Sequence, residues 1–292
     1  MSKPTPSPVV PAQMELGSIF NFKCHPEIEC FNECCKHADI TLTPYDILNL
    51  SNHLKLSSGD FLKKHTVPFE LDQSKMPGVK LKTQDKNPVC LFVDDKKGCS
   101  VYENRPTACR YYPLGVMAIK KADYNKDETN YSIIKEPHCM GHKENRKLSV
   151  AEYRKEQKTN TYDEYNRQFY QLILKKRSAG ASIGRLPEMS LQLFFMACYD
   201  LDRFKSFIKS PAFVATYDLK PDYQDLIFKD KTALLNFSFR FLKQVLFGEM
   251  TIDLIKGAQE QRLKNRADII KAKQEAEIYY HRQKEENLKR ED

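Results

Sequence analysis

The segment CHPEIECFNECCKH, residues 24–37, constrains this chain most, because it places four cysteines within twelve residues. The last two, Cys34 and Cys35, are adjacent. Neighbouring side chains in an extended segment point to opposite faces, so the pair can serve two sites, or one thiol can bind while the other packs. A disulfide framework, a redox pair or a metal site would each account for such a density of thiols.

Features elsewhere in the chain argue against disulfides. The first residues, MSKPTPSPVVPAQ, lack the apolar run of a signal peptide. No stretch approaches about 18 consecutive apolar residues, so we expect no membrane partner. We therefore expect a cytoplasmic protein. In a reducing compartment, clustered cysteines are more often metal ligands or redox groups than structural disulfides.

Eight of the nine cysteines precede residue 140. We predict that these eight form the metal-binding region: Cys24, Cys30, Cys34, Cys35, Cys90, Cys99, Cys109 and Cys139. They suffice for two four-cysteine sites, or for one cluster with four structural thiols nearby. The ninth, Cys198, lies in an apolar stretch, and we expect it to be a buried core residue.

The identity of the metal follows less directly from the sequence. Thiolate ligands select zinc, Cu(I) or iron–sulfur clusters over magnesium or calcium. The spacing Cys-x5-Cys-x3-Cys-Cys matches neither the paired CxxC of a zinc ribbon nor the cysteine run of a bacterial ferredoxin. We expect an iron–sulfur cluster or zinc as the cofactor, and the irregular spacing favours the cluster.

Several charged or polar residues lie beside these cysteines. Four histidines are neighbours that could add ligands, although exposed loop residues are the simpler interpretation: His25, His37, His138 and His142. Arg105 and Arg110 flank Cys109, and positive charge beside a thiolate lowers its pKa and stabilises an anionic cluster. The alternative is that Arg105 pairs with Glu103 or another carboxylate.

The chain resembles the YkgJ-like cysteine-cluster proteins, a family described as zinc- or iron-chelating domains. The resemblance covers roughly residues 20–142 and rests on FKCHPEIECFNECC, LTPYDILNL, SSGDFLKKH and CLFVDDKKGCSVYENRPTACRYYPLG. The cysteine motif is similar to that of the flagellin lysine methylases, for which an iron–sulfur cluster is expected. The resemblance implies that the eight cysteines form the metal region, and it implies no particular reaction.

An enzymatic function stays open on the sequence alone. The alternative to a simple metal-binding protein is a cluster-dependent enzyme, such as a protein-lysine methyltransferase with the cluster at its active site. Neither a phosphate-binding G-x-x-x-x-G-K-[ST] loop nor a dinucleotide-binding G-x-G-x-x-G motif occurs. The hydrolase motifs H-E-x-x-H and G-x-S-x-G are also missing. The sequence therefore leaves any catalytic residue unassigned.

The pattern along the chain predicts an α+β fold in four parts. Residues 1–18 are expected to be a disordered leader, and 19–148 the cysteine-cluster metal-binding domain with short strands and helices. Residues 149–255 are expected to be mainly helical, and 256–292 a charged C-terminal helix. The mixed signs of that tail suit a solvated helix, whose narrow apolar stripe could contact a protein partner.

Individual elements can also be predicted. Helices are expected after the capping signals at Thr43 and Ser149, and from near Ser58 and Pro187. Short strands are expected at residues 79–82, 90–93, 116–119 and 131–135. A turn at residues 94–98 would let Cys90 and Cys99 meet across a hairpin.

A nucleic-acid partner is not favoured by these patterns. The helices expected near residues 44–54 and 58–65 could form a helix-turn-helix. The second of them lacks the Arg, Asn or Gln side chains usually used to read base edges, so a scaffold role is preferred. The net charge of +8 is mild for 292 residues and does not demand an acidic partner.

Overall fold

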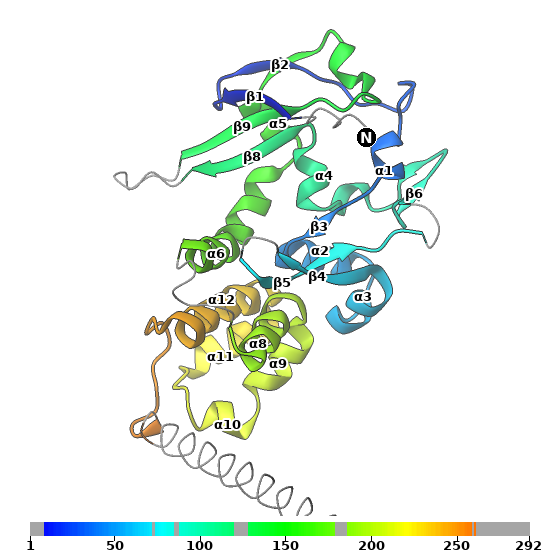
Figure 1. Ribbon diagram of the computed structural model, residues 1–292. Coiled ribbons are helices and arrows are strands. Elements are labelled where there is room, and N and C mark those ends of the chain that lie inside the picture. Colours follow the sequence, from blue (N-terminus) through cyan, green and yellow to red (C-terminus); the bar gives the residue numbers. More distant parts are fainter. Residues whose placement is uncertain are drawn as a thin grey trace, which may run out of the picture.

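Two hydrophobic cores organise the chain in the computed structural model, which describes residues 9–71, 74–84, 88–119, 128–178, 186–258 and 260. The small core lies among the strands at one end of the molecule, and the large core extends from the middle into the helices at the other end (Figure 1). The mixture of short strands with a mainly helical C-terminal part confirms the predicted α+β class.

Two antiparallel sheets enclose the small core. The first has the order β1-β9-β8, with β1 Val9–Met14, β9 Glu128–Ile134 and β8 Leu114–Ile119. The second pairs β2 Ile19–Asn21 with β10 Lys147–Ser149. The strands expected at residues 116–119 and 131–135 are thereby confirmed, and Val116 pairs with Tyr131 in the register.

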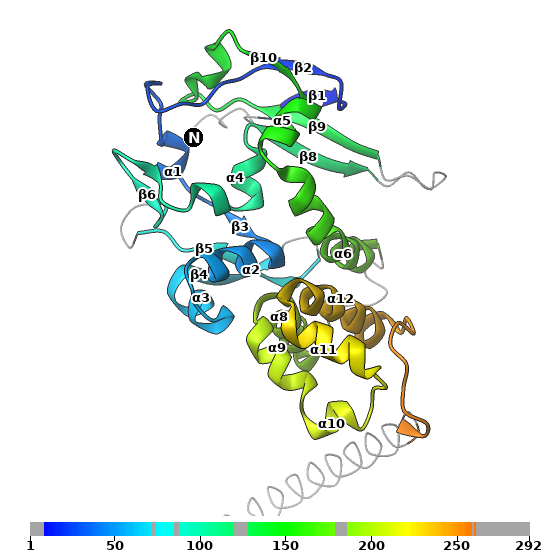
Figure 2. The same cartoon turned by 180° about the vertical axis from the view of Figure 1, so that it is seen from behind.

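Helix α5, Val150–Glu156, closes the small core and begins where the sequence predicts. Ser149 caps it, because its hydroxyl accepts from the Glu152 N–H while the Glu152 carboxylate accepts from the Ser149 N–H. The chain then breaks for two residues before the long helix α6, Thr159–Ser178. Helix α6 leads from the small core towards the helical end (Figures 1 and 2).

The middle of the molecule combines a second three-stranded sheet with two helices. The sheet has the order β3-β5-β4, with β3 Thr41–Leu42, β5 Met76–Leu81 and β4 Thr66–Leu71. Helix α2, Pro44–His53, starts at the predicted Thr43 cap, and α3, Ser58–His65, follows. The Ser58 hydroxyl donates to Asp200 at the start of α9, and Phe61 is fully buried, so these helices serve as scaffold.

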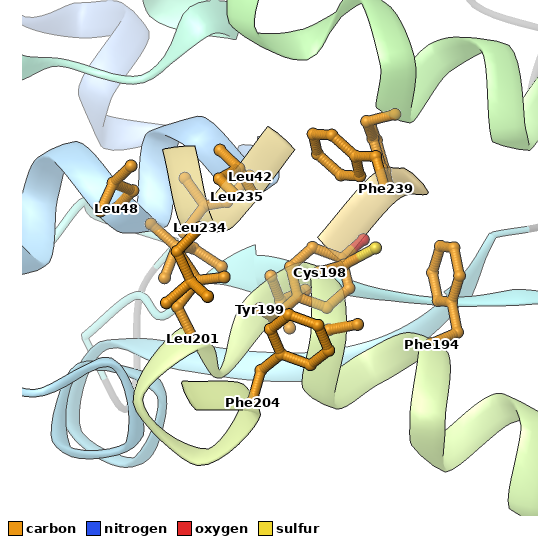
Figure 3. Packing of buried hydrophobic residues seen from close by; sticks show 14 of the residues in the cluster. Leu42, Leu48, Phe194, Cys198, Tyr199, Leu201, Phe204, Leu234, Leu235 and Phe239 are labelled. Atoms are coloured by element: carbon orange, nitrogen blue, oxygen red, sulfur yellow. The ribbon is translucent and has the colours of Figure 1, made fainter. Parts of the chain in front are cut away.

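Within the described residues, the helical end is built from α6 and five further helices around the large core. Their bounds are α8 Glu188–Tyr199, α9 Leu201–Ile208, α10 Pro211–Val214, α11 Pro221–Lys229 and α12 Lys231–Phe247. Cys198 is fully buried there beside Tyr199 and Phe204, as Figure 3 shows, which confirms its expected core role. Helices α9, α10 and α11 were not predicted individually.

Two expectations about the chain ends need comment. Residues 9–14 were expected in a disordered leader, but they form β1, because Val9 and Val10 pair with Ile134 and Ile133 of the distant strand β9. The tail beyond residue 260, which contains most of the expected charged helix, lies outside the described residues. Among the helices that are described, none is long and apolar enough to cross a membrane.

Candidate metal centre

The adjacent cysteines Cys34 and Cys35 lie on the short helix α1, Glu33–Lys36. Asn32 precedes the helix with a φ of 66°, a left-handed conformation that asparagine tolerates better than most residues. Its side-chain amide donates to the Asp94 carbonyl at 3.3 Å and ties α1 to the segment that follows Cys90. The two Sγ atoms are 4.0 Å apart. Helix α1 lies beside α4 and β6 in both views (Figures 1 and 2).

Three cysteines gather on the side of the small core, and we call Cys24, Cys30 and Cys139 the small-core thiol group. Their segments are joined by backbone contacts, since the Lys23 N–H donates to the Gly141 carbonyl at 3.1 Å. The Met140 N–H donates to the Cys30 Sγ at 3.1 Å, and Cys139 packs against the small core. These contacts bring residues more than 100 positions apart in the sequence to one place.

Gly141 explains how closely these two segments approach. A Cβ added at Gly141 would lie 2.7 Å from the Phe22 ring and 3.0 Å from the Lys23 carbonyl oxygen. Real Cβ atoms essentially never come within 3.0 Å of another heavy atom, so a side chain here would push the segments apart. The Cys139-Met-Gly sequence therefore has a packing reason for its glycine.

Three other cysteines gather on the side of the large core, and we call Cys90, Cys99 and Cys109 the large-core thiol group. The Cys90 N–H donates to the Cys35 carbonyl at 2.8 Å, which joins this group directly to α1. Cys90 belongs to the large core, and Cys35 and Cys99 pack against it. The backbone thus places Cys35 on this side of α1.

The predicted hairpin forms, but its first strand starts later than expected. Strand β6, Val93–Asp94, pairs with β7, Gly98–Cys99, and Cys99 lies opposite Val93. Cys90 forms an isolated bridge with Thr83 before the hairpin begins. The expected strand at residues 90–93 is therefore wrong except at Val93. Cys90 and Cys99 flank the hairpin, and the charge of Cys99 contributes to the raised pKa of Cys90 after burial.

Cys109 is carried by the short helix α4, Thr107–Tyr111, whose start is held by a buried carboxylate. Asp46 accepts from the Thr107 N–H at 2.8 Å and from the Thr107 hydroxyl at 2.7 Å. The same carboxylate accepts from the Thr43 N–H at 2.9 Å in the capping box of α2. The sequence indicates the capping role of Asp46, but only the tertiary structure reveals that it also positions α4.

Electrostatic interactions follow the same division of the thiols. Burial raises the pKa of the Cys24 thiol to about 11, and the thiolates of Cys34, Cys30 and Cys139 add to the rise. Burial likewise raises the pKa of Cys109, with further contributions from Cys90, Cys99 and Cys34. Because such interactions weaken with distance, each thiol is close enough to its group to oppose ionisation of its neighbours.

The adjacent pair couples the two groups. The hydrogen bond between the thiols lowers the pKa of Cys34 and raises the pKa of Cys35, so Cys34 ionises first. After that contact and burial, the charges that raise the pKa of Cys35 are the thiolates of Cys34, Cys90 and Cys109. Cys34 is exposed, whereas Cys35 is partly buried.

Arg105 is a buried cation whose charge acts on a thiol of each group. It donates to the Tyr102 carbonyl at 2.8 Å and to the Gln157 side chain, and it stacks over the Tyr102 ring. Its charge partly offsets the effects of burial that raise the pKa of Cys24 and of Cys99. Glu103 pairs with Lys158 at 3.3 Å and not with Arg105. The interpretation in which the charge of Arg105 lowers the pKa of nearby thiols is therefore better supported than pairing with Glu103.

The four histidines beside the cysteines differ in their contacts. The His142 Nε2 lies 3.0 Å from the Ile134 carbonyl, and its ring contacts Phe22, so His142 is structural. His37 is exposed. The His25 ring nitrogens lie 3.7 Å from the carboxylates of Glu27 and Glu144, and the His138 Nε2 lies 3.5 Å from that of Glu136. His25 and His138 therefore have carboxylate neighbours of their own.

The thiols lie in neighbouring segments, but they do not form a complete metal site. Over the described part of the chain, no three or more His, Cys, Asp or Glu side chains are close enough to hold an ion together. The eight predicted cysteines nevertheless lie on segments that meet around α1. Their donor chemistry fits a thiophilic metal, because several thiols share a partly buried region that also contains a buried arginine.

Comparison with known proteins agrees with this chemistry. The family model described as "CxxCxxCC: Putative zinc- or iron-chelating domain" matches residues 23–168, which is half of the chain. No curated protein matches the chain significantly, and neither does any solved structure. The matched span begins just before Cys24 and includes all eight predicted cysteines. The chain therefore belongs to the CxxCxxCC family of zinc- or iron-chelating domains.

Proposed function

We propose that this protein binds a metal cofactor through Cys24, Cys30, Cys34, Cys35, Cys90, Cys99, Cys109 and Cys139, with an iron–sulfur cluster preferred over zinc. The observation that supports the proposal is that segments carrying these thiols, far apart in the sequence, are hydrogen-bonded to one another beside α1. The family match supports zinc or iron as the metal.

The electrostatics of the thiols give a physical reason for metal binding. Several of these thiols have a raised pKa because they are buried and because neighbouring thiolates would repel them. A metal ion or cluster removes that repulsion, since its positive charge stabilises thiolates. Binding would release the thiol protons and would add its free energy to the stability of the surrounding fold.

The preference for an iron–sulfur cluster rests on ligand spacing and resemblance. The ligands do not follow the paired CxxC arrangement typical of structural zinc sites. The resemblance to the flagellin lysine methylases points in the same direction. All nine cysteines are free thiols, which suits a reducing compartment, and we propose a cytoplasmic location. We propose metal binding as the function and assign no reaction to it.

Metal and sulfide analysis of anaerobically purified protein tests this function. We expect iron, labile sulfide and visible charge-transfer absorption. Protein with zinc but without iron, sulfide or colour would reject the iron–sulfur form and support the zinc form. Protein that holds neither metal, even after reconstitution under reducing conditions, would reject metal binding altogether. The Cys198→Ala variant is the matched control, because Cys198 is buried in the large core and should not affect metal content.

A further inference from the structure

The eight thiols could form one site or two, and the structure distinguishes these arrangements by the way each thiol is attached. The small-core thiol group sits on contacts between residues 23–30 and 139–141, and Cys139 packs against the small core. The large-core thiol group sits on the large core, where Cys90 is buried and Cys99 packs against it. The two groups are thus held by different cores.

Each group contains three cysteines, and α1 supplies two more between them. Successive side chains on a helix are about 100° apart, so Cys34 and Cys35 leave α1 in different directions. Cys35 packs against the large core, and its carbonyl accepts from the Cys90 N–H. Cys34 is exposed.

The residues that flank Cys34 and Cys35 on α1 contact the small-core side. The Glu33 N–H donates to the Cys30 carbonyl at 3.1 Å. The His37 ring, directly after α1, lies 6.5 Å from the ring of His138, which precedes Cys139. The Cys34 and Cys35 Sγ atoms are 4.0 Å apart, so α1 lies at the boundary of the two groups.

We infer that α1 divides the thiols into two four-cysteine metal sites: one formed by Cys24, Cys30, Cys34 and Cys139, and the other by Cys35, Cys90, Cys99 and Cys109. The inference rests on the proposed function, because it assumes that these thiols bind metal. It explains why the chain has adjacent cysteines at all: one position on a short helix serves each core.

The division into two sites can be tested by measuring the metal content of variants with one or two cysteine substitutions. Each single change from cysteine to serine should remove half of the metal bound by the wild type. Cys24→Ser/Cys30→Ser lies within one site and should still keep half, whereas Cys24→Ser/Cys99→Ser spans both and should keep none. For the adjacent pair, Cys34→Ser/Cys24→Ser should keep half and Cys35→Ser/Cys24→Ser should keep none.

A single shared site predicts a different result. Within-site and cross-site double variants would then lose the same amount of metal, and that outcome would overturn the division. Wild-type protein without metal would instead be a failure of the proposed function, so the two failures are distinguishable. The Cys198→Ala control should match the wild type. Helical circular dichroism identifies variants that fail to fold.

A second measurement needs no variants and uses the wild-type chain. Protein is treated anaerobically with a chelator until half of its metal remains, then alkylated with iodoacetamide and weighed intact by mass spectrometry. Two sites predict molecules in which four of the eight thiols are alkylated. A population in which each molecule has either none or all eight of these thiols alkylated would contradict the inference.

Discussion

A fully buried carboxylate joins the helix after the first cysteine motif to the helix that carries Cys109. Asp46 accepts hydrogen bonds from the backbone N–H groups of Thr43 and Thr107 and from the Thr107 hydroxyl. Burial raises its pKa, and these donors oppose the rise by favouring the charged form. The donors would be left without their acceptor if the carboxylate were lost.

We expect the Asp46→Asn substitution to lower the free energy of unfolding by about 2–3 kcal/mol, because an amide offers one acceptor oxygen and sets its NH2 against a backbone N–H. Urea denaturation measures the change. The control is Asp39→Asn, which alters an exposed carboxylate paired with Lys80 and should change stability by about 0.5 kcal/mol or less. Equal effects of the two substitutions would contradict the positioning role of Asp46.

Because of His65, the free energy of unfolding should decrease as the pH falls into the acidic range. Its ring lies against Phe61 and Phe92, with centroid distances of 5.2 and 5.3 Å. Burial lowers the pKa of His65, and the charge of Lys64 lowers it further. The unfolded chain therefore binds a proton first as pH falls through about 6.5. The stabilising contribution is fully present above that pH and is lost as pH falls towards the folded-state pKa.

The His65→Phe variant should retain more of its neutral-pH stability under acid than the wild type does, because phenylalanine binds no proton. Denaturant unfolding at about pH 7 and about pH 5 measures the loss for each protein. If both proteins lose the same free energy of unfolding between these pH values, a group other than His65 is responsible for the pH dependence.

At the scale of elements, the β6–β7 hairpin depends on one glycine. Gly98 has a φ of +83°, and a Cβ added there would lie 2.9 Å from the Phe31 ring. Both the backbone conformation and the close approach to the cysteine segment therefore require glycine. Since Cys99 follows directly, the position of one proposed ligand depends on this turn.

Gly98→Ala should destabilise the fold by about 1–3 kcal/mol, because it adds a steric clash to a strained φ. Gly248→Ala isolates the strain, since Gly248 has a φ of +73° with nothing within 4 Å of its added Cβ. Gly17→Ala has neither effect. Thermal unfolding should rank the losses as Gly98, then Gly248, then Gly17. Equal losses at Gly98 and Gly248 would exclude a contribution from the Phe31 contact.

Local signals predicted the elements that carry their own caps. The Thr43 and Ser149 capping boxes start α2 and α5. Strand β1 escaped prediction because its partner β9 lies more than 100 residues away. The late start of β6 escaped prediction as well, since Phe31 and Asn32 contact the hairpin from outside the turn.

At the scale of the whole molecule, the two cores should depend on metal to different degrees. The small core has ten buried residues among those described, and the large core has thirty-two. A small core supplies less apolar burial, so a bound metal contributes a larger share of its stability. The small-core thiol group joins the segments that flank β2 and β10.

We therefore expect metal removal to increase amide hydrogen exchange by about tenfold or more in β2 and β10, corresponding to about 1.4 kcal/mol of local stability. Helices α8 and α12 of the large core should change much less. Hydrogen exchange with mass spectrometry, before and after anaerobic chelation, measures both regions together. A uniform increase over the chain, or none near β2, would refute the unequal dependence.

The sequence by itself determined the α+β class, the capped helices, the core position of Cys198 and the membership in a metal-chelating family. These follow from local patterns, in which a few neighbouring residues carry the physical cause. That all eight cysteines bind metal stays a prediction. Only the tertiary structure decided which thiols are neighbours, because contacts such as Cys90 N–H to Cys35 O and Met140 N–H to Cys30 Sγ join distant segments through packing.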